Sequence, residues 1–322
     1  MMLDKTATPT SLPLKVIRQL DLHTPVSLGR AAHLSAASGL VAVGDYFYVV
    51  ADDEYQLGIF SRRQHQQPGE LLSLFAGVLP DEAKARKAQK PDLEALVQLP
   101  AFAGYPQGAL LAIGSGSKAN RQRAVVLPLN AQAQVTGVSQ ILDLSALYVA
   151  LQASFVDLNI EGAVVTAEHL YLLQRGNKGE GTFSAIIEVK LAAVLEAINT
   201  SGVIPASALG AIRRCDIGEV NGTPLSFTDA ALLPDGSWVF TAAAEATADS
   251  YNDGEVVGAA IGVLNAHGQV VRLYPLAAVY KMEGIAAEVQ GDTVQLWLVT
   301  DADDPATAAV LLAAQLQGYP FS

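Results

Sequence analysis

One pattern occurs five times along this chain: an apolar segment that begins with a polar residue, then a second apolar segment that ends in polar residues. Residues 159–177 show it most clearly, because Glu161 begins the first segment and Gln174 to Asn177 end the second. Short apolar segments joined by a turn predict a β-hairpin. The first residue of one strand and the last residues of its partner lie at the same end of a hairpin, so we expect these polar residues to lie together.

The five copies follow one another along most of the chain. Their first polar residues, which we call the lead residues, are Ser38, Glu94, Glu161, Asp229 and Glu283. Successive lead residues are 56, 67, 68 and 54 positions apart. Repeats of this length that consist of strands are typical of β-propeller blades. We therefore predict an all-β protein, a five-bladed β-propeller, with residues 14–322 in a single domain.

A strand that precedes the first copy is expected to complete the last blade. Residues 308–316 supply only a third strand for the copy that begins at Glu283, whereas residues 14–22 have a strand-like pattern and no copy of their own. A closed propeller leaves no free sheet edge, so we predict that residues 14–22 pair into the last blade. Residues 1–13 are then expected to form a flexible N-terminus.

Composition excludes several classes of protein. Of the 322 residues 51% are hydrophobic, which is ample for a core, yet no apolar run reaches the length of a membrane span. The N-terminus lacks the basic and then apolar order of a secretory signal, and the single Cys215 has no partner for an internal disulfide. We therefore expect a cytoplasmic protein without a membrane partner. The net charge of −12 argues against a nucleic-acid partner.

The lead residues are expected to form a ring, because the inner strand of each propeller blade lines the central channel. Four of the five are carboxylic acids, and such acids lie close together only if they bind a cation or take up protons. Oxygen ligands from several strands suit calcium, which accepts irregular coordination. We predict a calcium cofactor bound by Ser38, Glu94, Glu161, Asp229 and Glu283. In the alternative interpretation, these acids cap backbone amides or pair with Lys and Arg.

Polar residues at the ends of the second strands are expected to lie at the same face of the propeller. The candidate catalytic residues are Asp52, Glu245 and Asp301. The candidate substrate-binding residues are Lys118, Arg175, Asn177 and Tyr251. Basic side chains beside a metal ion suit a phosphorylated or otherwise anionic small molecule. Each of these residues taken singly is more often a solvated loop residue, so the prediction depends on their common position.

Other chemical signatures are weak or absent. The segment Gly114-Ser-Gly-Ser-Lys118 has the glycines and the lysine of a phosphate-binding loop but not the Walker spacing. The chain has no Gly-x-Ser-x-Gly motif, so the usual serine esterase nucleophile is missing. Axial carboxylates also suit glycoside hydrolysis. An aromatic content of only 7% disfavours a cleft that stacks sugars.

The segments around the lead residues resemble those of calcium-activated nucleotidases, the apyrase propellers. They read Ser38-Gly-Leu-Val, Glu94-Ala-Leu, Glu161-Gly-Ala, Asp229-Ala-Ala-Leu-Leu-Pro and Lys281-Met-Glu-Gly-Ile. They are also similar to repeats in bacterial phytase-like and esterase-like propellers. The resemblance to the nucleotidases implies five blades and an axial calcium held by serines and glutamates at the lead positions. Asp229 stands where that family has a serine.

Two functions from different classes are consistent with these patterns. The first is a calcium-dependent hydrolase that acts on a phosphorylated or ester small molecule at the central funnel. The alternative is a non-catalytic propeller that binds a ligand or a protein, with a structural cation on its axis.

Overall fold

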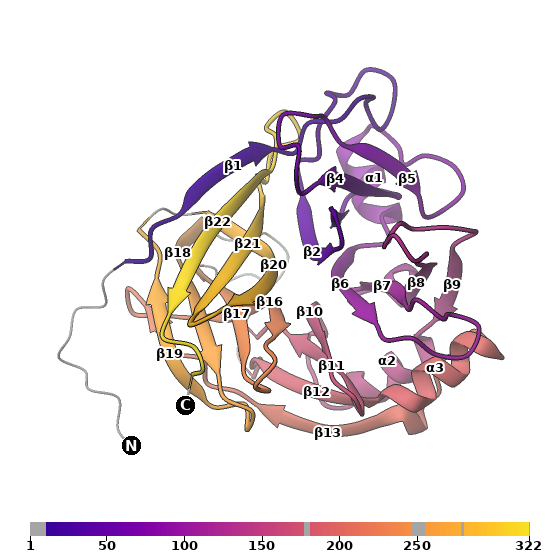
Figure 1. Ribbon diagram of the computed structural model, residues 1–322. Coiled ribbons are helices and arrows are strands. Elements are labelled where there is room, and N and C mark those ends of the chain that lie inside the picture. The colour runs from indigo at the N-terminus through magenta and orange to yellow at the C-terminus, as the bar shows by residue number, and fades with distance from the viewer. Residues whose placement is uncertain (1–10, 177–180, 247–254, 278–279, 322) are drawn as a thin grey trace.

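The computed structural model describes residues 11–176, 181–246, 255–277 and 280–321. Five four-stranded antiparallel sheets are arranged around a common centre (Figure 1). This arrangement confirms the predicted five-bladed β-propeller. Within the described residues no helix is both long and apolar enough to cross a membrane.

Each blade runs from an inner strand at the centre to an outer strand at the periphery. Blade 1 consists of β2 (Ala37–Val43), β3 (Tyr46–Ala51), β4 (Gln56–Ser61) and β5 (Glu70–Ser73). Blade 2 consists of β6 (Leu93–Leu99), β7 (Ala109–Gly114), β8 (Arg123–Pro128) and β9 (Gln140–Asp143). Blade 3 consists of β10 (Ile160–Val165), β11 (His169–Gln174), β12 (Ala185–Lys190) and β13 (Leu209–Arg214). Blade 4 consists of β16 (Ser226–Leu232), β17 (Trp238–Ala246), β18 (Glu255–Leu264) and β19 (Val270–Pro275).

Blade 5 is built from both ends of the described chain. Its order is β20 (Lys281–Gln290), β21 (Thr293–Asp301), β22 (Val310–Gln317) and, outermost, β1 (Lys15–Gln19). The register places Lys15 opposite Ala313 and Gln19 opposite Val310. The predicted closure of the last blade by the N-terminal strand is confirmed.

Part of the segment that we expected to be flexible is packed against the propeller. Residues 1–10 lie outside the described residues. Leu12, however, is only 9% exposed and forms a parallel bridge with Leu276 at the end of blade 4. Its side chain joins the apolar cluster between blades 4 and 5, so the ordered contacts begin before residue 14.

The strands form where they do because most of them are covered on both faces. All six residues of β7 are buried, as are five of the six residues of β3. A strand packed between two neighbouring sheets reads as a continuous apolar run rather than as an alternation. The outer strands β5 and β13 are half-exposed. The turn before β17 follows from Pro234-Asp-Gly, since Gly236 has a φ of 84°.

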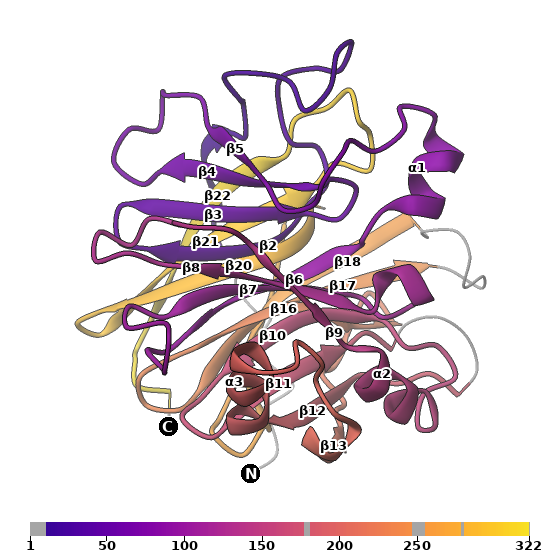
Figure 2. The same cartoon turned by 90° about the vertical axis from the view of Figure 1, so that its right-hand side faces the viewer.

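The short helices lie outside the sheets. They are α1 (Ala83–Gln89), α2 (Ser145–Gln152) and α3 (Leu191–Asn199), with single 3-10 turns at Ala119–Arg121 and Ala206–Ala208. A two-stranded hairpin, β14 (Glu219–Val220) and β15 (Thr223–Pro224), connects blades 3 and 4. In Figure 2, α1 lies beyond the strand ends at one side of the propeller. This is the side on which the candidate site is found.

Candidate functional site

A central cavity opens at the α1 side of the propeller. Its volume is about 920 Å³, and its lining comes from blades 1, 2, 3 and 5, from α1 and from the loops before β2 and after β21. The described lining includes eight Lys or Arg and eleven Asp or Glu side chains but no Phe, Tyr or Trp. The cavity is therefore suited to a charged ligand more than to one that stacks on aromatic rings.

The inner strands place one distinctive residue each at this end of the axis. Each of β2, β6, β10, β16 and β20 contacts the inner strands of both neighbouring blades, so together they close a ring. In every blade the pairing between the first and second strands skips one inner-strand residue, which is a β-bulge. The skipped residues, which we call the bulge residues, are Ser38, Glu94, Glu161, Thr228 and Glu283. Bulges of this kind re-aim side chains next to functional sites.

This register corrects the predicted ring in blade 4. The equivalent residue there is Thr228, whereas Asp229 occupies the position that Gly39, Gly162 and Gly284 hold in other blades. The ring therefore has three glutamates and two hydroxyl residues instead of four acids. Thr228 is fully buried, and its hydroxyl donates to the hydroxyl of Thr241 at 2.9 Å.

Asp229 instead joins two blades. Its side chain is 1% exposed, and one carboxylate oxygen accepts a 3.0 Å hydrogen bond from the backbone amide of Ile285 in blade 5. The other oxygen lies 2.8 Å from where a Cβ on Gly162 of blade 3 would stand. The inner strands approach so closely that this position requires glycine, or a small residue, on most blades. Asp229 is accommodated because its carboxylate meets a backbone donor.

Arg175 brings a positive charge to the ring from outside the bulge positions. It follows β11, is 6% exposed, and its guanidinium donates to Glu161 at 3.0 Å and also to Glu245 in blade 4. On the other side of the ring, the Lys281 ammonium lies 3.6 Å from Glu283 and 2.8 Å from Asp301. These cations offset much of the negative charge that the sequence places at the axis.

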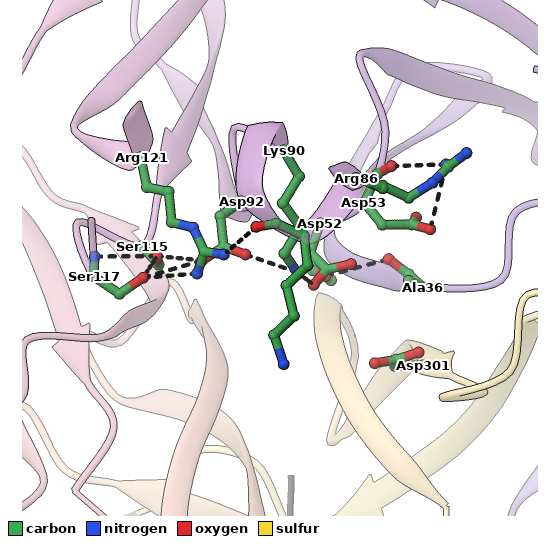
Figure 3. Close-up of polar contacts among 12 residues, drawn as sticks. Ala36, Asp52, Asp53, Arg86, Lys90, Asp92, Ser115, Ser117, Arg121 and Asp301 are labelled. Carbon is green, nitrogen blue, oxygen red and sulfur yellow. Dashed lines mark hydrogen bonds and ion pairs between the residues drawn. The ribbon is translucent and has the colours of Figure 1, made fainter. Parts of the chain in front are cut away.

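A second network lies between blades 1 and 2 and is centred on Asp92 (Figure 3). Lys90 lies 2.8 Å from Asp92 and also contacts Asp52, and Arg121 donates to Asp92 at 2.7 Å. Carboxylate oxygens of Asp52, Asp92 and the bulge residue Glu94 lie within 4.8 Å of one another. Sequence reasoning missed Asp92 and Lys90. The sequence feature that could have indicated them is the charged segment Lys90-Pro-Asp92, which ends two residues before Glu94.

A third network holds the loop before β2 against α1. Arg30 and Arg86 both contact Glu54, the latter at 3.2 Å, and both lie within 4 Å of Asp53. Burial raises the pKa of Glu54 to about 7, with a further contribution from Asp53. Glu54 does not face the cavity, so this network is structural: it fixes the part of the wall that Arg30 supplies.

The ring glutamates differ in their surroundings. Glu94 has no hydrogen-bond or ion-pair partner within the described chain, and burial, followed by Asp92 and Glu161, raises its pKa well above the usual value. Burial also raises the pKa of Glu283 to about 8, and Glu161 adds to this while Lys281 opposes it. One oxygen of Glu283, Oε1, is buried without a hydrogen bond. Glu161, by contrast, is held by Arg175 and by the side-chain amide of Asn159.

The remaining candidate residues separate into three groups. Asp52, Lys118, Arg175 and Asp301 line the cavity. Glu245 does not: its side chain is buried against Arg175, so it is not placed to act on a ligand. Asn177 and Tyr251 lie outside the described residues.

The fold and the cavity together define a five-bladed propeller with a charged axial site. The chain belongs to a family of unknown function, DUF6929, whose model matches residues 33–316. No curated protein matches it.

Two solved structures are similar over nearly their whole length. The catalytic domain of the GH62 α-L-arabinofuranosidase from Coprinopsis cinerea has a TM-score of 0.55 at 10% identity, over 97% of this chain and 99% of that one. An α-L-arabinofuranosidase from Podospora anserina, in complex with cellotriose, has a TM-score of 0.53 at 10% identity, over 96% and 98%. At this identity the similarity shows a shared propeller fold.

Proposed function

We propose that the cavity is the active site of a calcium-dependent hydrolase that acts on a small anionic ester. The observation that carries the proposal is the ring of bulge residues, in which five equivalent positions supply three carboxylates and two hydroxyls. Carboxylate and hydroxyl oxygens are hard ligands, and their origin on five separate strands suits the irregular coordination of calcium.

The described residues fit a cation at this point. Glu283 Oε1 is buried without a hydrogen bond, with the Lys281 ammonium 3.6 Å away, and Glu94 makes no hydrogen bond or ion pair within the described chain, so both have lone pairs to offer. Burying an acceptor without a partner is unfavourable, and an ion would remove that cost. Ser38 and the three glutamates all line the cavity, whereas Thr228 is not part of the lining and its hydroxyl donates to Thr241.

The residues around the ring have separable roles in such a reaction. Calcium, when bound, would polarise an oxygen of the ester. Asp52 lies on the cavity wall with its backbone amide tied to Ala36 at 3.1 Å and its carboxylate tied to Lys90. We assign to it the role of accepting a proton from water. The absence of aromatic residues from the described lining disfavours the sugar ligands of the similar structures and favours a charged substrate.

One observation favours the alternative of a non-catalytic propeller. Arg175 joins Glu161 to Glu245, so part of the axis is a buried ion-pair network that links blades 3 and 4. Buried networks of this kind can serve the fold alone. Calcium would then act as a structural ion, and its removal would affect stability without affecting turnover of any substrate.

The two functions are separated by measuring calcium binding and hydrolysis on the same protein. After chelation, added calcium should raise the melting temperature with the logarithm of its concentration, because it binds only the folded chain. The protein should also hydrolyse the anionic ester p-nitrophenyl phosphate with calcium and not with chelator, and p-nitrophenyl acetate serves as the uncharged ester for comparison. Calcium stabilisation without hydrolysis would favour the alternative. An unchanged melting curve, with no calcium in elemental analysis, would contradict both.

The variant Glu94→Gln makes the test specific to the ring. Glu94 makes no hydrogen bond or ion pair within the described chain, so the change breaks no such contact there and should leave the calcium-free protein folded. We expect its calcium-dependent rise in melting temperature to be much smaller than that of the wild type. Glu168→Gln, in the exposed turn before β11, is the matched control and should respond as the wild type does.

A further inference from the structure

Positive charge gathers on one wall of the cavity, which we call the blade 2 wall and define as Lys87, Ser117, Lys118 and Arg121. All four residues line the cavity. Lys87 comes from α1, and the other three come from the connection between β7 and β8. With Lys90, this side of the cavity carries four basic residues around the carboxylates of Asp52, Asp92 and Glu94.

The connection that supplies this wall is rigidly held. It begins with the segment Gly114-Ser-Gly-Ser-Lys118, which has the glycines and the lysine of a phosphate-binding loop. The Tyr148 hydroxyl donates to the Gly114 carbonyl at 2.7 Å, and the Gly116 amide donates to the Arg121 carbonyl at 3.1 Å. Gly116 has a φ of 76°, and a Cβ there would lie 2.5 Å from the Tyr148 ring. The loop is thus fixed by its packing before any ligand binds.

Arg121 and Lys87 keep donors that no residue of the described chain uses. One guanidinium nitrogen of Arg121, Nη1, donates to Asp92 and, at 2.9 Å, to the Ser117 hydroxyl, while Nη2 donates to the Lys87 carbonyl at 3.0 Å. Each of these nitrogens carries two hydrogens, so Nη2 keeps one for another acceptor. Arg121 is 7% exposed and is anchored by Asp92. This contact holds the Arg121 guanidinium in one orientation. The exposed Lys87 ammonium forms no ion pair within the described chain.

We propose that the blade 2 wall binds the phosphoryl group of the substrate, so that the ester is a phosphate monoester rather than a carboxylic ester. An oriented guanidinium and two ammonium groups match a tetrahedral dianion, which accepts several charge-assisted hydrogen bonds at once. The Ser117 hydroxyl is not counted among these donors, because it lies against Asp92 and Ser115. The wall adjoins Glu94 through Asp92, so a phosphoryl group there lies beside the ring. The hydrolysis of a phosphate ester at this wall rests on the proposed function, whereas the phosphate-binding site itself does not.

Inorganic phosphate is the probe that tests the wall without calcium or turnover. Isothermal titration of the chelated protein with phosphate should show binding, and the double variant Lys87→Ala, Lys118→Ala should weaken it about tenfold or more. Lys84→Ala changes an exposed lysine of the same helix that does not line the cavity, and it should bind phosphate as the wild type does. Equal phosphate affinity in the double variant and the control would overturn the proposal.

Enzyme kinetics provide a second test of the phosphate site. With p-nitrophenyl phosphate the double variant should raise KM with little change in kcat, because the lysines bind the group without taking part in bond cleavage. With p-nitrophenyl acetate it should behave as the wild type. A wild-type preference for the acetate would overturn the inference while leaving a calcium-dependent hydrolase in place. Phosphate binding at the wall without a calcium-dependent rise in melting temperature would instead contradict the proposed function, but the phosphate site at the wall would stand.

Discussion

Arg175, directly after β11 in blade 3, donates a hydrogen bond to Glu245 on β17 in blade 4, and both side chains are almost completely buried. The same guanidinium holds Glu161, so one cation joins the ends of two neighbouring blades near the axis. An ion pair this deep is stabilising only while both charges are present, because each is costly to bury alone.

Replacement of Arg175 by Met should therefore destabilise the protein strongly. It leaves Glu161 and Glu245 buried without their cation, and we expect a loss of about 3–5 kcal/mol in the free energy of unfolding. Urea unfolding at pH 7 measures the change. Arg63→Met removes an exposed pair with Asp45 and should cost at most about 1 kcal/mol. A similar, small loss in both variants would show that the axial network contributes little.

Asp229 should make stability fall as pH rises. Burial raises the pKa of the Asp229 carboxyl well above its usual value, so the folded state binds the proton more tightly than the unfolded state does. Its contribution to the free energy of unfolding is then largest at acid pH and is lost as pH rises above about 4. Asp229→Asn keeps an oxygen for the Ile285 amide and has no proton to lose. The stability of this variant relative to that of the wild type should therefore increase as pH rises.

The comparison with Asp229→Ala separates charge from hydrogen bonding. Alanine leaves the buried Ile285 amide without its acceptor, which should cost about 1–3 kcal/mol at any pH. Thermal unfolding of the three proteins between pH 4 and pH 9 provides the data. If the asparagine and alanine variants lose equal stability at every pH, the carboxylate does not join the blades through this bond.

Deletion of residues 1–22 should expose the edge of β22. The deletion removes β1 and the buried side chains of Leu20 and Leu22, and an unpaired apolar edge strand favours association between molecules. Size-exclusion chromatography should show oligomers or aggregates, with a lower melting temperature. Val16→Ala, which changes an exposed side chain on the same strand, is the control and should remain wild-type-like. A truncated protein that is monomeric and equally stable would contradict a structural role for closure.

The number of blades and the position of most strands could be predicted because each blade repeats the same apolar pattern. Burial on both faces makes β3 and β7 almost entirely apolar, and that signal is plain in one sequence. The closure by β1 followed from counting strands. These features depend on local composition and on a rule about sheet edges, so they need no knowledge of distant contacts.

The ring in blade 4 could not be predicted, because a β-bulge leaves no mark in a single sequence. Asp229-Ala230 looks like the other lead pairs, a polar residue followed by a small one, whereas the register selects Thr228. The destinations of Arg175 and Lys90 were also hidden. Each is a long side chain whose partners lie on another blade or before another strand, and only the packed structure brings them together.

The pairing of β1 with β22 also has a consequence for how the protein is made. Lys15 leaves the ribosome long before its partner Ala313, and at about 5–20 residues per second the interval is on the order of tens of seconds. During that time four blades can form in order, but blade 5 has no complete sheet. β1 therefore stays without its partner strand until synthesis of β22, which is the period when the nascent chain most needs protection by chaperones.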